Sequence, residues 1–388
     1  MADSEKEKPR SKKGIVIFLA AVFVLGLLAF AGYRIYRYIN DPYTGFAAVY
    51  TEEVIGGDGV RFMPYLEGYI RVSKDGAEAV DSDGLRLWNM SYVMNNPEIV
   101  VCGKCASVAD IGGYVAVVTD GAGNVSRVEM PYKIEEIECS EVGVTAIRMN
   151  DESSDYIRLV DIAGEKIAEI KTVEAKDGFP VDMALSYDAK KLLTSYLVID
   201  GENSRGWLTF YNFGNVGQDF TNNITGIFKY DEVVPVVNFL GKNSACAFFD
   251  DEIRFFTVSE VPSEGKRVGF EEYIIAANAS DKGVVVMENS KESGITSVTK
   301  AYDTAGNLVF ESKSSNELTG AMYYGKNLLF YNEYACQILD KSGKVIFNGN
   351  FGGLAINSIM PSNGKDRLLL FENGKVTTIR LTKDNKVE

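Results

Sequence analysis

The chain has 388 residues, of which 46% are hydrophobic and nine are proline, and its formal net charge is −14. This composition excludes a disordered stalk, and the acidic balance argues against a nucleic-acid partner because a negative surface repels a polyanion. The sequence contains no histidine. Catalytic arrangements that need an imidazole, such as Ser-His-Asp, are therefore excluded, as are His-ligated metal sites.

The first apolar segment lies near the N-terminus, where Gly14 to Tyr33 runs for 20 residues without a charge. As a helix this segment is about 30 Å long, enough to cross a bilayer. Residues 1–13 carry five basic side chains, against two, Arg34 and Arg37, behind the segment. By the positive-inside rule the N-terminus is cytoplasmic and the rest extracytoplasmic. We predict a single-pass signal-anchor helix in the cell membrane that contacts the lipid bilayer through residues 14–33.

A cleavable signal peptide is the alternative. Ala29-Phe30-Ala31 has the small-x-small form that a signal peptidase accepts. The apolar run to Tyr33 and the interfacial residues that follow it favour the uncleaved anchor. Cleavage at Ala31 stays open, and either alternative exports most of the chain.

The exported part is predicted to be one domain. No Pro-, Ser- or Gly-rich linker and no charge block interrupts residues 60 to 382. The predicted regions are a cytoplasmic basic tail (1–13), the membrane helix (14–33), a juxtamembrane linker (34–45), a β-propeller domain (46–382) and a C-terminal tail (383–388).

A short turn motif recurs along this domain. Asp-x-x-Gly is typical of a β-hairpin, because Asp hydrogen-bonds the backbone two residues on and Gly accepts the positive φ that re-enters a strand. Neighbouring copies are separated by 39, 41 and 37 residues, the period of a four-stranded propeller blade. The five copies are Asp81-Gly84, Asp120-Gly123, Asp161-Gly164, Asp303-Gly306 and Asp340-Gly343.

Eight apolar segments are expected to be the second strand of a blade, which neighbouring blades bury on both faces. We therefore predict an all-β, eight-bladed (alternatively seven-bladed) β-propeller. The segments are 69–72, 114–118, 144–147, 192–198, 245–249, 284–287, 328–331 and 368–371. Residues 165–260 are the least regular, so the blade count there stays open. In that stretch Trp207–Gly214 is expected to replace the Asp-x-x-Gly hairpin.

The last unit ends one strand short. After Leu368–Phe371 and Val376–Leu381 no further strand follows, so an early strand must complete the blade. Phe46–Tyr50 has suitable length and composition, and its pairing there would remove exposed sheet edges.

Five cysteines are too few and too odd in number for a disulfide framework. Cys102 and Cys105 form the one close pair, a candidate disulfide or thiol pair. A redox role would need a thioredoxin-like βαβ setting, and a zinc site would need two more ligands. We interpret the pair as incidental, between blades 1 and 2.

Two other groups of residues are candidate binding sites. Acidic runs at Glu52-Glu53, Asp250-Asp251-Glu252 and Glu271-Glu272 lack the ligand spacing of a calcium loop and are typical of solvated turns. Aromatic residues could form platforms for a glycan or peptide, although such residues more often pack blades together. These are Trp207, Phe210, Tyr211, Phe213, Tyr323, Tyr324, Tyr331 and Tyr334. No catalytic, cofactor-binding or metal-binding residue is predicted.

A family resemblance follows from the repeats. Asp81 to Trp88 resembles the Asp-x-x-Gly-x-x-x-Trp element of quinoprotein-like and WD40-like propeller repeats, with Phe310 and Phe347 in place of Trp in later copies. The whole layout is similar to an uncharacterised family of membrane-anchored, exported proteins of Gram-positive bacteria, a domain of unknown function. The resemblance implies a propeller-like exported domain and carries no activity. The adjacent cysteines of quinoprotein dehydrogenases are absent.

These features predict a membrane-anchored extracytoplasmic propeller that acts as a protein-binding or scaffold module of the cell envelope, with an unknown envelope protein as partner and no cofactor. We do not expect an enzyme. The alternative is an exported enzyme with carboxylate or quinone-type chemistry in the propeller channel. Several carboxylates with a Lys or Arg at one end of that channel would favour it. A third hypothesis, a sensor that acts through the basic tail, is limited by the tail's 13 residues.

Overall fold

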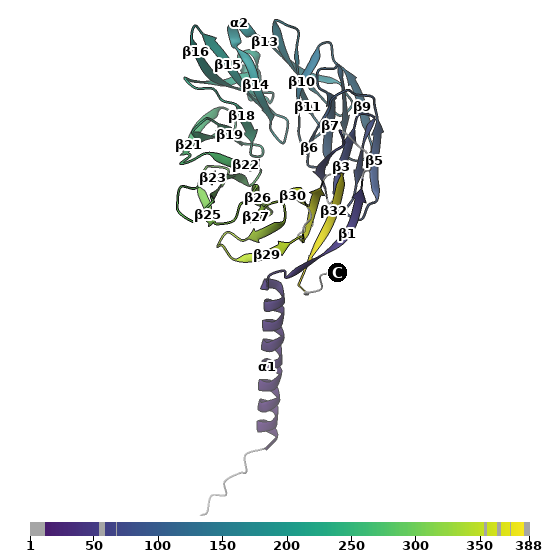
Figure 1. Ribbon diagram of the computed structural model, residues 1–388, viewed down its shortest axis with the longest axis vertical. Helices are drawn as coiled ribbons and strands as arrows, with labels where there is room; N and C mark the ends of the chain where they lie inside the picture. Colours follow the sequence, from purple (N-terminus) through teal and green to yellow (C-terminus); the bar gives the residue numbers. More distant parts are fainter. Residues whose placement is uncertain are drawn as a thin grey trace, which may run out of the picture.

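The computed structural model describes residues 12–53, 59–66, 68–352, 355–362, 366–372 and 374–383. These residues form eight four-stranded antiparallel sheets arranged as blades around a central axis (Figure 1). The prediction of an eight-bladed β-propeller is confirmed, and the seven-bladed alternative is wrong.

The blades follow one another along the chain, each with its first strand innermost. Blades 1 to 4 comprise β2 (Arg61–Tyr65), β3 (Gly68–Ser73), β4 (Gly76–Val80) and β5 (Arg86–Ser91); β6 (Pro97–Cys102), β7 (Cys105–Asp110), β8 (Val115–Thr119) and β9 (Val125–Glu129); β10 (Lys133–Cys139), β11 (Thr145–Asn150), β12 (Ser154–Val160) and β13 (Lys166–Val173); and β14 (Phe179–Leu185), β15 (Lys191–Asp200), β16 (Asn203–Asn212) and β17 (Ile224–Tyr230). Blades 5 to 8 comprise β18 (Val236–Phe239), β19 (Ser244–Phe248), β20 (Glu252–Val258) and β21 (Pro262–Gly269); β22 (Ile274–Ser280), β23 (Gly283–Asn289), β24 (Ser297–Tyr302) and β25 (Leu308–Ser314); β26 (Gly320–Tyr324), β27 (Asn327–Tyr331), β28 (Ala335–Leu339) and β29 (Val345–Asn350); and β30 (Ile356–Pro361), β31 (Arg367–Glu372), β32 (Lys375–Thr382) and β1 (Gly45–Glu53).

Strand β1 closes the ring as the fourth strand of blade 8. It pairs antiparallel with β32, from Gly45 opposite Thr382 to Glu53 opposite Lys375. The predicted closure by Phe46–Tyr50 is confirmed. The N-terminal and C-terminal parts of the propeller therefore share one sheet. Because β1 pairs with β32, the third strand of blade 8 has no unpaired edge.

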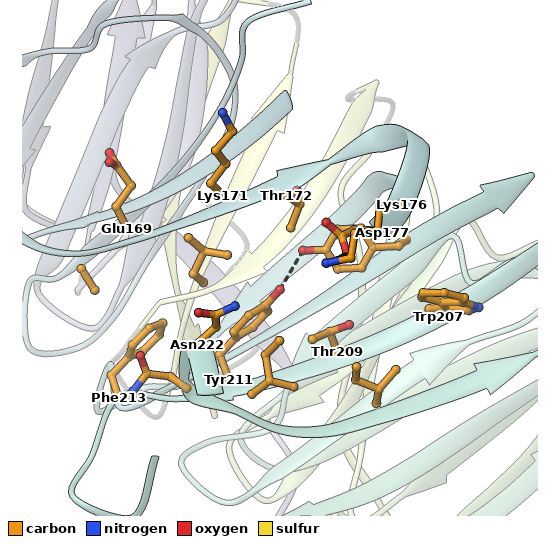
Figure 2. Close-up of a pocket in the computed structure, with 16 residues that line it drawn as sticks. Glu169, Lys171, Thr172, Lys176, Asp177, Trp207, Thr209, Tyr211, Phe213 and Asn222 are labelled. Atoms are coloured by element: carbon orange, nitrogen blue, oxygen red, sulfur yellow. Dashed lines mark hydrogen bonds and ion pairs between the residues drawn. The ribbon is translucent and has the colours of Figure 1, made fainter. Parts of the chain in front are cut away.

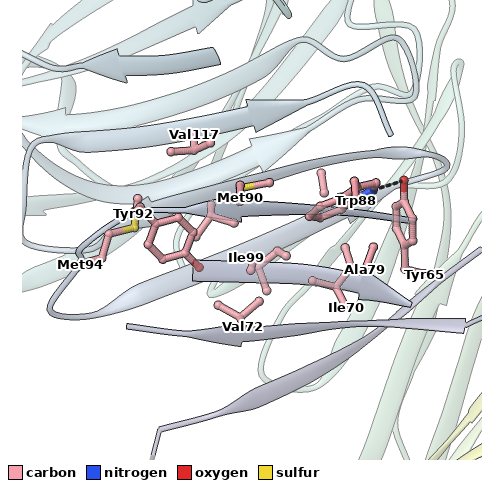
Figure 3. Packing of buried hydrophobic residues seen from close by; sticks show 13 residues of the cluster. Tyr65, Ile70, Val72, Ala79, Trp88, Met90, Tyr92, Met94, Ile99 and Val117 are labelled. Carbon is pink, nitrogen blue, oxygen red and sulfur yellow. Dashed lines mark hydrogen bonds between the residues drawn. The ribbon is translucent and has the colours of Figure 1, made fainter. Parts of the chain in front are cut away.

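The hydrophobic core is divided among the blade junctions. Eight buried clusters lie one between each pair of neighbouring blades. The second strands supply both sides, because alternate side chains point to opposite faces of a sheet. Leu192, for example, packs toward blade 3, whereas Leu193 packs toward blade 5. Figure 3 shows the junction of blades 1 and 2, where Trp88 Nε1 donates to Tyr65 Oη at 3.1 Å.

Seven of the eight predicted second strands occupy that place, and the segment 114–118 does not. It lies in β8, the third strand of blade 2, whereas the second strand is β7. All six residues of β7 are buried. Its interior is built mainly from small side chains such as Ala106 and Ser107, so the larger valines of β8 gave the stronger hydrophobic signal.

All five Asp-x-x-Gly motifs connect the third and fourth strands of a blade. In each turn the Asp Oδ1 accepts hydrogen bonds from the backbone N–H groups two and four residues later. The five glycines have φ between 81° and 97°. At Asp120, the hydrogen bond from the Asn124 side chain and those from the backbone lower the carboxyl pKa. Seven residues beyond Asp81, Asp303 and Asp340, the buried Trp88, Phe310 and Phe347 pack into blade junctions.

Two of these glycines permit a matched test. A Cβ atom at Gly306 would lie 2.6 Å from Phe255 Cδ2, whereas a Cβ at Gly343 meets nothing within 4 Å. Both have positive φ, so valine strains the backbone at both. We expect Gly306→Val to lower the free energy of unfolding by about 1 to 3 kcal/mol, and by more than Gly343→Val. Denaturant unfolding of the full chain measures the difference, and equal losses would contradict the packing contribution.

Blade 4 departs from the pattern. The prediction that Trp207–Gly214 replaces the hairpin is wrong, because residues 207–212 belong to the ten-residue strand β16. The connection to β17 runs through two short 3-10 turns, η1 (Val216–Asp219) and η2 (Thr221–Asn223). In the sequence, aromatic residues followed by a glycine can mark either the end of a strand or a turn. The pairing of β16 with β15 and β17 shows that here they belong to a strand.

Helix α1 (Lys12–Asn40) leaves the rim of the ring and extends away from it (Figure 1). Its segment Ile17–Arg37 has the length and mean hydropathy of a membrane span or signal sequence. Residues 34–40, placed in the juxtamembrane linker by sequence, continue the helix. The chain then bonds to the ring at once: Tyr43 N donates to Ile346 O at 2.7 Å and Thr44 N to Thr382 O at 2.9 Å. The basic tail lies almost wholly outside the described residues.

The ring has two distinct faces. Because successive strands run in opposite directions, the connections between first and second and between third and fourth strands lie on one face, which we call the turn face. The remaining connections, including those between blades, lie on the opposite linker face. One of these, between blades 3 and 4, contains the short helix α2 (Glu174–Asp177).

Candidate functional site

The junction of blades 3 and 4 gathers most of the features that can bind or exchange protons. On its inner side, carboxylates lie on the innermost strands β10 of blade 3 and β14 of blade 4, and Glu98 on β6 of blade 2 is close enough to act on them electrostatically. Glu136 Oε2 accepts from Arg148 Nε at 2.8 Å, and its Oε1 accepts from Met183 N in blade 4 at 3.0 Å. Asp182 Oδ2 in turn accepts from Val237 N in blade 5 at 2.7 Å. These two acids thus link three consecutive blades on the inner side of the ring.

Backbone irregularities position both acids. The pairing register shifts just before Glu136 in β10 and just before Asp182 in β14. A β-bulge re-aims the side chain that follows it and often lies beside a functional site. Here the bulges direct both carboxylates toward the next blade.

Burial and mutual repulsion change the titration of these acids. Burial raises the pKa of Glu138 to about 8, helped by the negative charges of Glu136, Asp182 and Glu98. Burial also raises the pKa of Glu136 to about 7, against the lowering effect of Arg148 and with the raising effect of Asp182. At neutral pH the cluster therefore retains protons that exposed carboxylates would lose. Such groups can exchange protons near pH 7.

On the outer side of the same junction lies a cleft of about 660 Å³ (Figure 2). Strand β13 forms its blade 3 wall with Glu169, Lys171 and Thr172, and strand β16 places Trp207 and Thr209 on the opposite wall. Lys176 and Asp177 of α2 close the end at the linker face. The cleft is therefore open at the rim and combines aromatic surface with groups of both charges.

Two tyrosines form the floor of the cleft. The hydroxyls of Tyr196 and Tyr211 lie 3.0 Å apart and share a hydrogen bond. Burial raises the pKa of Tyr196 to about 12 and that of Tyr211 further, so both hydroxyls stay neutral. Trp207 is only partly buried, and Lys229 Nζ lies 3.8 Å from its ring centroid. This cation–π contact holds the indole on the blade 4 wall.

The aromatic residues singled out by sequence separate into different places. Trp207, Tyr211 and Phe213 line the cleft, whereas Phe210 is buried in the core between blades 4 and 5. Tyr323 and Tyr324 border another cavity of about 680 Å³ on the turn face, beside Lys282 and Lys326. Tyr331 packs between blades 7 and 8, and Tyr334 is exposed.

The acidic runs do not form one site. Glu52 pairs with Arg71 at 2.7 Å, Glu252 with Arg254 at 2.5 Å and Glu271 with Lys300 at 3.1 Å, each in a different part of the ring. Within the described ranges no group of three or more Asp, Glu or Cys side chains is arranged to hold a metal ion. Sequence reasoning missed Glu136, Glu138 and Asp182, although the Glu-x-Glu spacing in an apolar strand was an available signal.

The cysteine pair lies within blade 2 and not between blades 1 and 2, because the β6–β7 hairpin places Cys102 opposite Cys105. All five thiols of the chain are free. Burial, and to a smaller extent the nearby Glu141, raises the pKa of Cys102 to about 12. The thiolate is the reactive form of cysteine. Because burial and a raised pKa keep Cys102 protonated, its thiol is unreactive.

The family model of DUF5711, a family of unknown function, matches residues 39–381. The chain belongs to the DUF5711 family. Among curated proteins, no sequence matches it. Similar solved structures include the Dos1 propeller, with 13% identity over 86% of this chain and 95% of that one (TM-score 0.54), and Saccharomyces cerevisiae Sqt1, with 9% identity over 88% and 99% (TM-score 0.56). These WD40-like structures show that the DUF5711 chain shares their fold. At such low identities they carry no information about its function.

Proposed function

We propose that this DUF5711 protein is a membrane-anchored, extracytoplasmic propeller that binds a protein partner of the cell envelope through the cleft between blades 3 and 4. The observation that carries the proposal is the cleft itself, whose partly exposed indole, neutral hydroxyl floor and charged rim suit an extended protein segment. Trp and Tyr are the residues that most often dominate protein interfaces.

The anchor supports the location. The apolar helix is joined to the ring by only four residues, 41–44. Tyr43 bonds to the outermost strand of blade 7, β29, and Thr44 to the third strand of blade 8, β32. The excess of basic residues before the helix orients the propeller to the outside. A ring held at its rim leaves both faces and the blade 3–4 cleft open to envelope proteins.

Crosslinking pull-down of the full chain from its native membrane tests this proposal. Trp207→Ala should reduce capture of the specific partner at least tenfold, on the order of the effect of an aromatic hot spot. The matched control is Tyr334→Ala, which removes an aromatic side chain that is 51% exposed in blade 7. Both variants should keep the wild-type melting temperature. Equal capture by Trp207→Ala and wild type would overturn the cleft as the binding site.

A second candidate is an enzyme that uses carboxylate chemistry in the channel. Glu136, Glu138 and Asp182 with Arg148 at the junction of blades 3 and 4 favour it, since the pKa values near neutrality suit a general acid or base. The protein-binding proposal ranks first because Glu136 and Asp182 have a structural task at the same place, the links to Met183 and Val237.

A further inference from the structure

A smaller cavity lies on the inner side of helix α2, at the linker face of the same blade junction. Its volume is about 240 Å³. Three carboxylates line it, from Glu135 at the start of β10, Asp155 at the start of β12 and Glu174 in α2. We call it the Asp155 pocket. It is separate from the Trp207 cleft, whose end is formed by other residues of α2.

Asp155 is the unusual member of this group. The residue is 3% exposed, and within the described part of the chain its carboxylate accepts a hydrogen bond from Asn150 Nδ2 alone, at 3.2 Å to Oδ1. The same amide also donates to Glu174 Oε1 at 3.1 Å. One neutral donor thus serves two carboxylates. A buried carboxylate with so little compensation is energetically costly unless a cation meets it.

The charge balance of the wall favours a cation. Arg148 supplies the positive charge among the lining residues, and Glu136 already holds its guanidinium at 2.8 Å. Burial raises the pKa of Asp155, and the charges of Glu174 and Glu135 add to the rise against the lowering by Asn150 and Arg148. The three carboxylates therefore stay short of positive charge.

The opposite wall is apolar. Phe179, which is 42% exposed, and Pro180 line it at the start of β14. A methylene stem can pack on such a wall while a charged head reaches the carboxylates. An ammonium group fits better than a guanidinium, because its three donors radiate from one point toward acceptors on three elements, whereas the planar fork of Arg suits a single carboxylate.

We propose that the Asp155 pocket binds the side chain of a lysine, with its ammonium group between Asp155, Glu135 and Glu174 and its stem against Phe179. Assignment of this lysine to the envelope partner rests on the proposed function of the cleft. The partner would then carry a lysine close to the segment that contacts Trp207, since α2 borders both sites.

A small probe tests the pocket without any partner. The full chain is placed in nanodiscs of zwitterionic lipid, and N-acetyl-lysine methylamide is titrated by calorimetry or saturation-transfer NMR. Saturable binding in the millimolar range is expected. The norleucine analogue, which has a similar stem without the ammonium group, should not bind. Equal binding of the two, or tighter binding of the arginine analogue, would overturn the assignment.

Variants then locate the site. Asp155→Asn keeps the size of the side chain and removes its charge, so probe affinity should fall at least tenfold. Glu135→Gln, at an exposed position, should weaken binding about threefold and covers the case in which the first variant does not fold. Glu152→Gln removes a charge from the linker face outside the pocket and should bind as wild type. Unchanged affinity in both pocket variants would refute the proposal.

The two proposals fail separately. Trp207→Ala should bind the lysine probe normally even though partner capture is lost. If Trp207→Ala loses partner capture but the wild-type chain does not bind the lysine probe, only the proposal for the Asp155 pocket fails. If the lysine probe binds but Trp207→Ala captures the partner as well as wild type does, only the proposal for the cleft fails.

Discussion

Glu138→Gln should make the propeller more stable at pH 8 and abolish much of its loss of stability between pH 5 and pH 8. Burial, with the charges of Glu136, Asp182 and Glu98, raises the pKa of Glu138 to about 8 in the folded chain. The unfolded chain releases this proton at the ordinary pKa of a glutamate, so the folded state holds more protons across that interval and its stability falls as pH rises.

The size of the effect follows from the same shift. Glu138 is only partly buried, so solvent screens some of its charge, and the gain at pH 8 is about 2 kcal/mol. No hydrogen bond is given up, because the structure records none to this carboxylate within the described residues. Denaturant unfolding at pH 5, 6.5 and 8 measures the dependence. Glu129→Gln, at an exposed position on β9, should keep the wild-type profile; a wild-type profile in Glu138→Gln would refute the assignment.

The same variant separates the two functional candidates. If the carboxylates on the inner side of the ring perform chemistry, Glu138→Gln should lose the cellular function of the protein while it stays folded and keeps its partner. If the carboxylates only hold blades together and titrate, the variant should complement a deletion strain fully. Full complementation would remove the enzyme candidate.

Deletion of residues 1–53 should destabilise the ring strongly. The deletion removes β1 and thus the fourth strand of blade 8. It also removes Glu52, which holds Arg71 of blade 1 at 2.7 Å and accepts from the Tyr69 hydroxyl, and Phe46, whose ring packs on Phe351 at 5.1 Å. We expect a loss of about 4 kcal/mol and a fall in melting temperature of roughly 6 °C.

The control is deletion of residues 1–40, which removes the helix and leaves β1 in place. This shorter deletion should melt within about 2 °C of the full chain, because the closing strand and its contacts with blade 1 remain. Circular dichroism during heating compares the two. Equal melting temperatures for the two deletions would mean that closure by β1 adds nothing to stability.

Much of the fold could be predicted because its signals are local. Asp81 and its four counterparts bond their own turns within four residues, and the second strands alternate between two buried faces over a few residues. Closure by Phe46–Tyr50 followed from counting strands. The errors arose where local signals were ambiguous. Strand β7 is fully buried but its side chains are small, so its hydrophobic signal was weak, and Trp207 lies in a strand whose C-terminal sequence resembles a turn.

The sequence by itself thus determined the apolar N-terminal helix, the repeated turn, the blade period and the closing strand, since each depends on neighbouring residues or on a count along the chain. Only the tertiary structure decided the sites. It brings Glu136 to Asp182, and Asp155 to Glu135 and Glu174, across turns and blade boundaries. Burial and the pKa values that follow from it arise from this packing, and a linear spacing carries no measure of how much water a carboxylate loses.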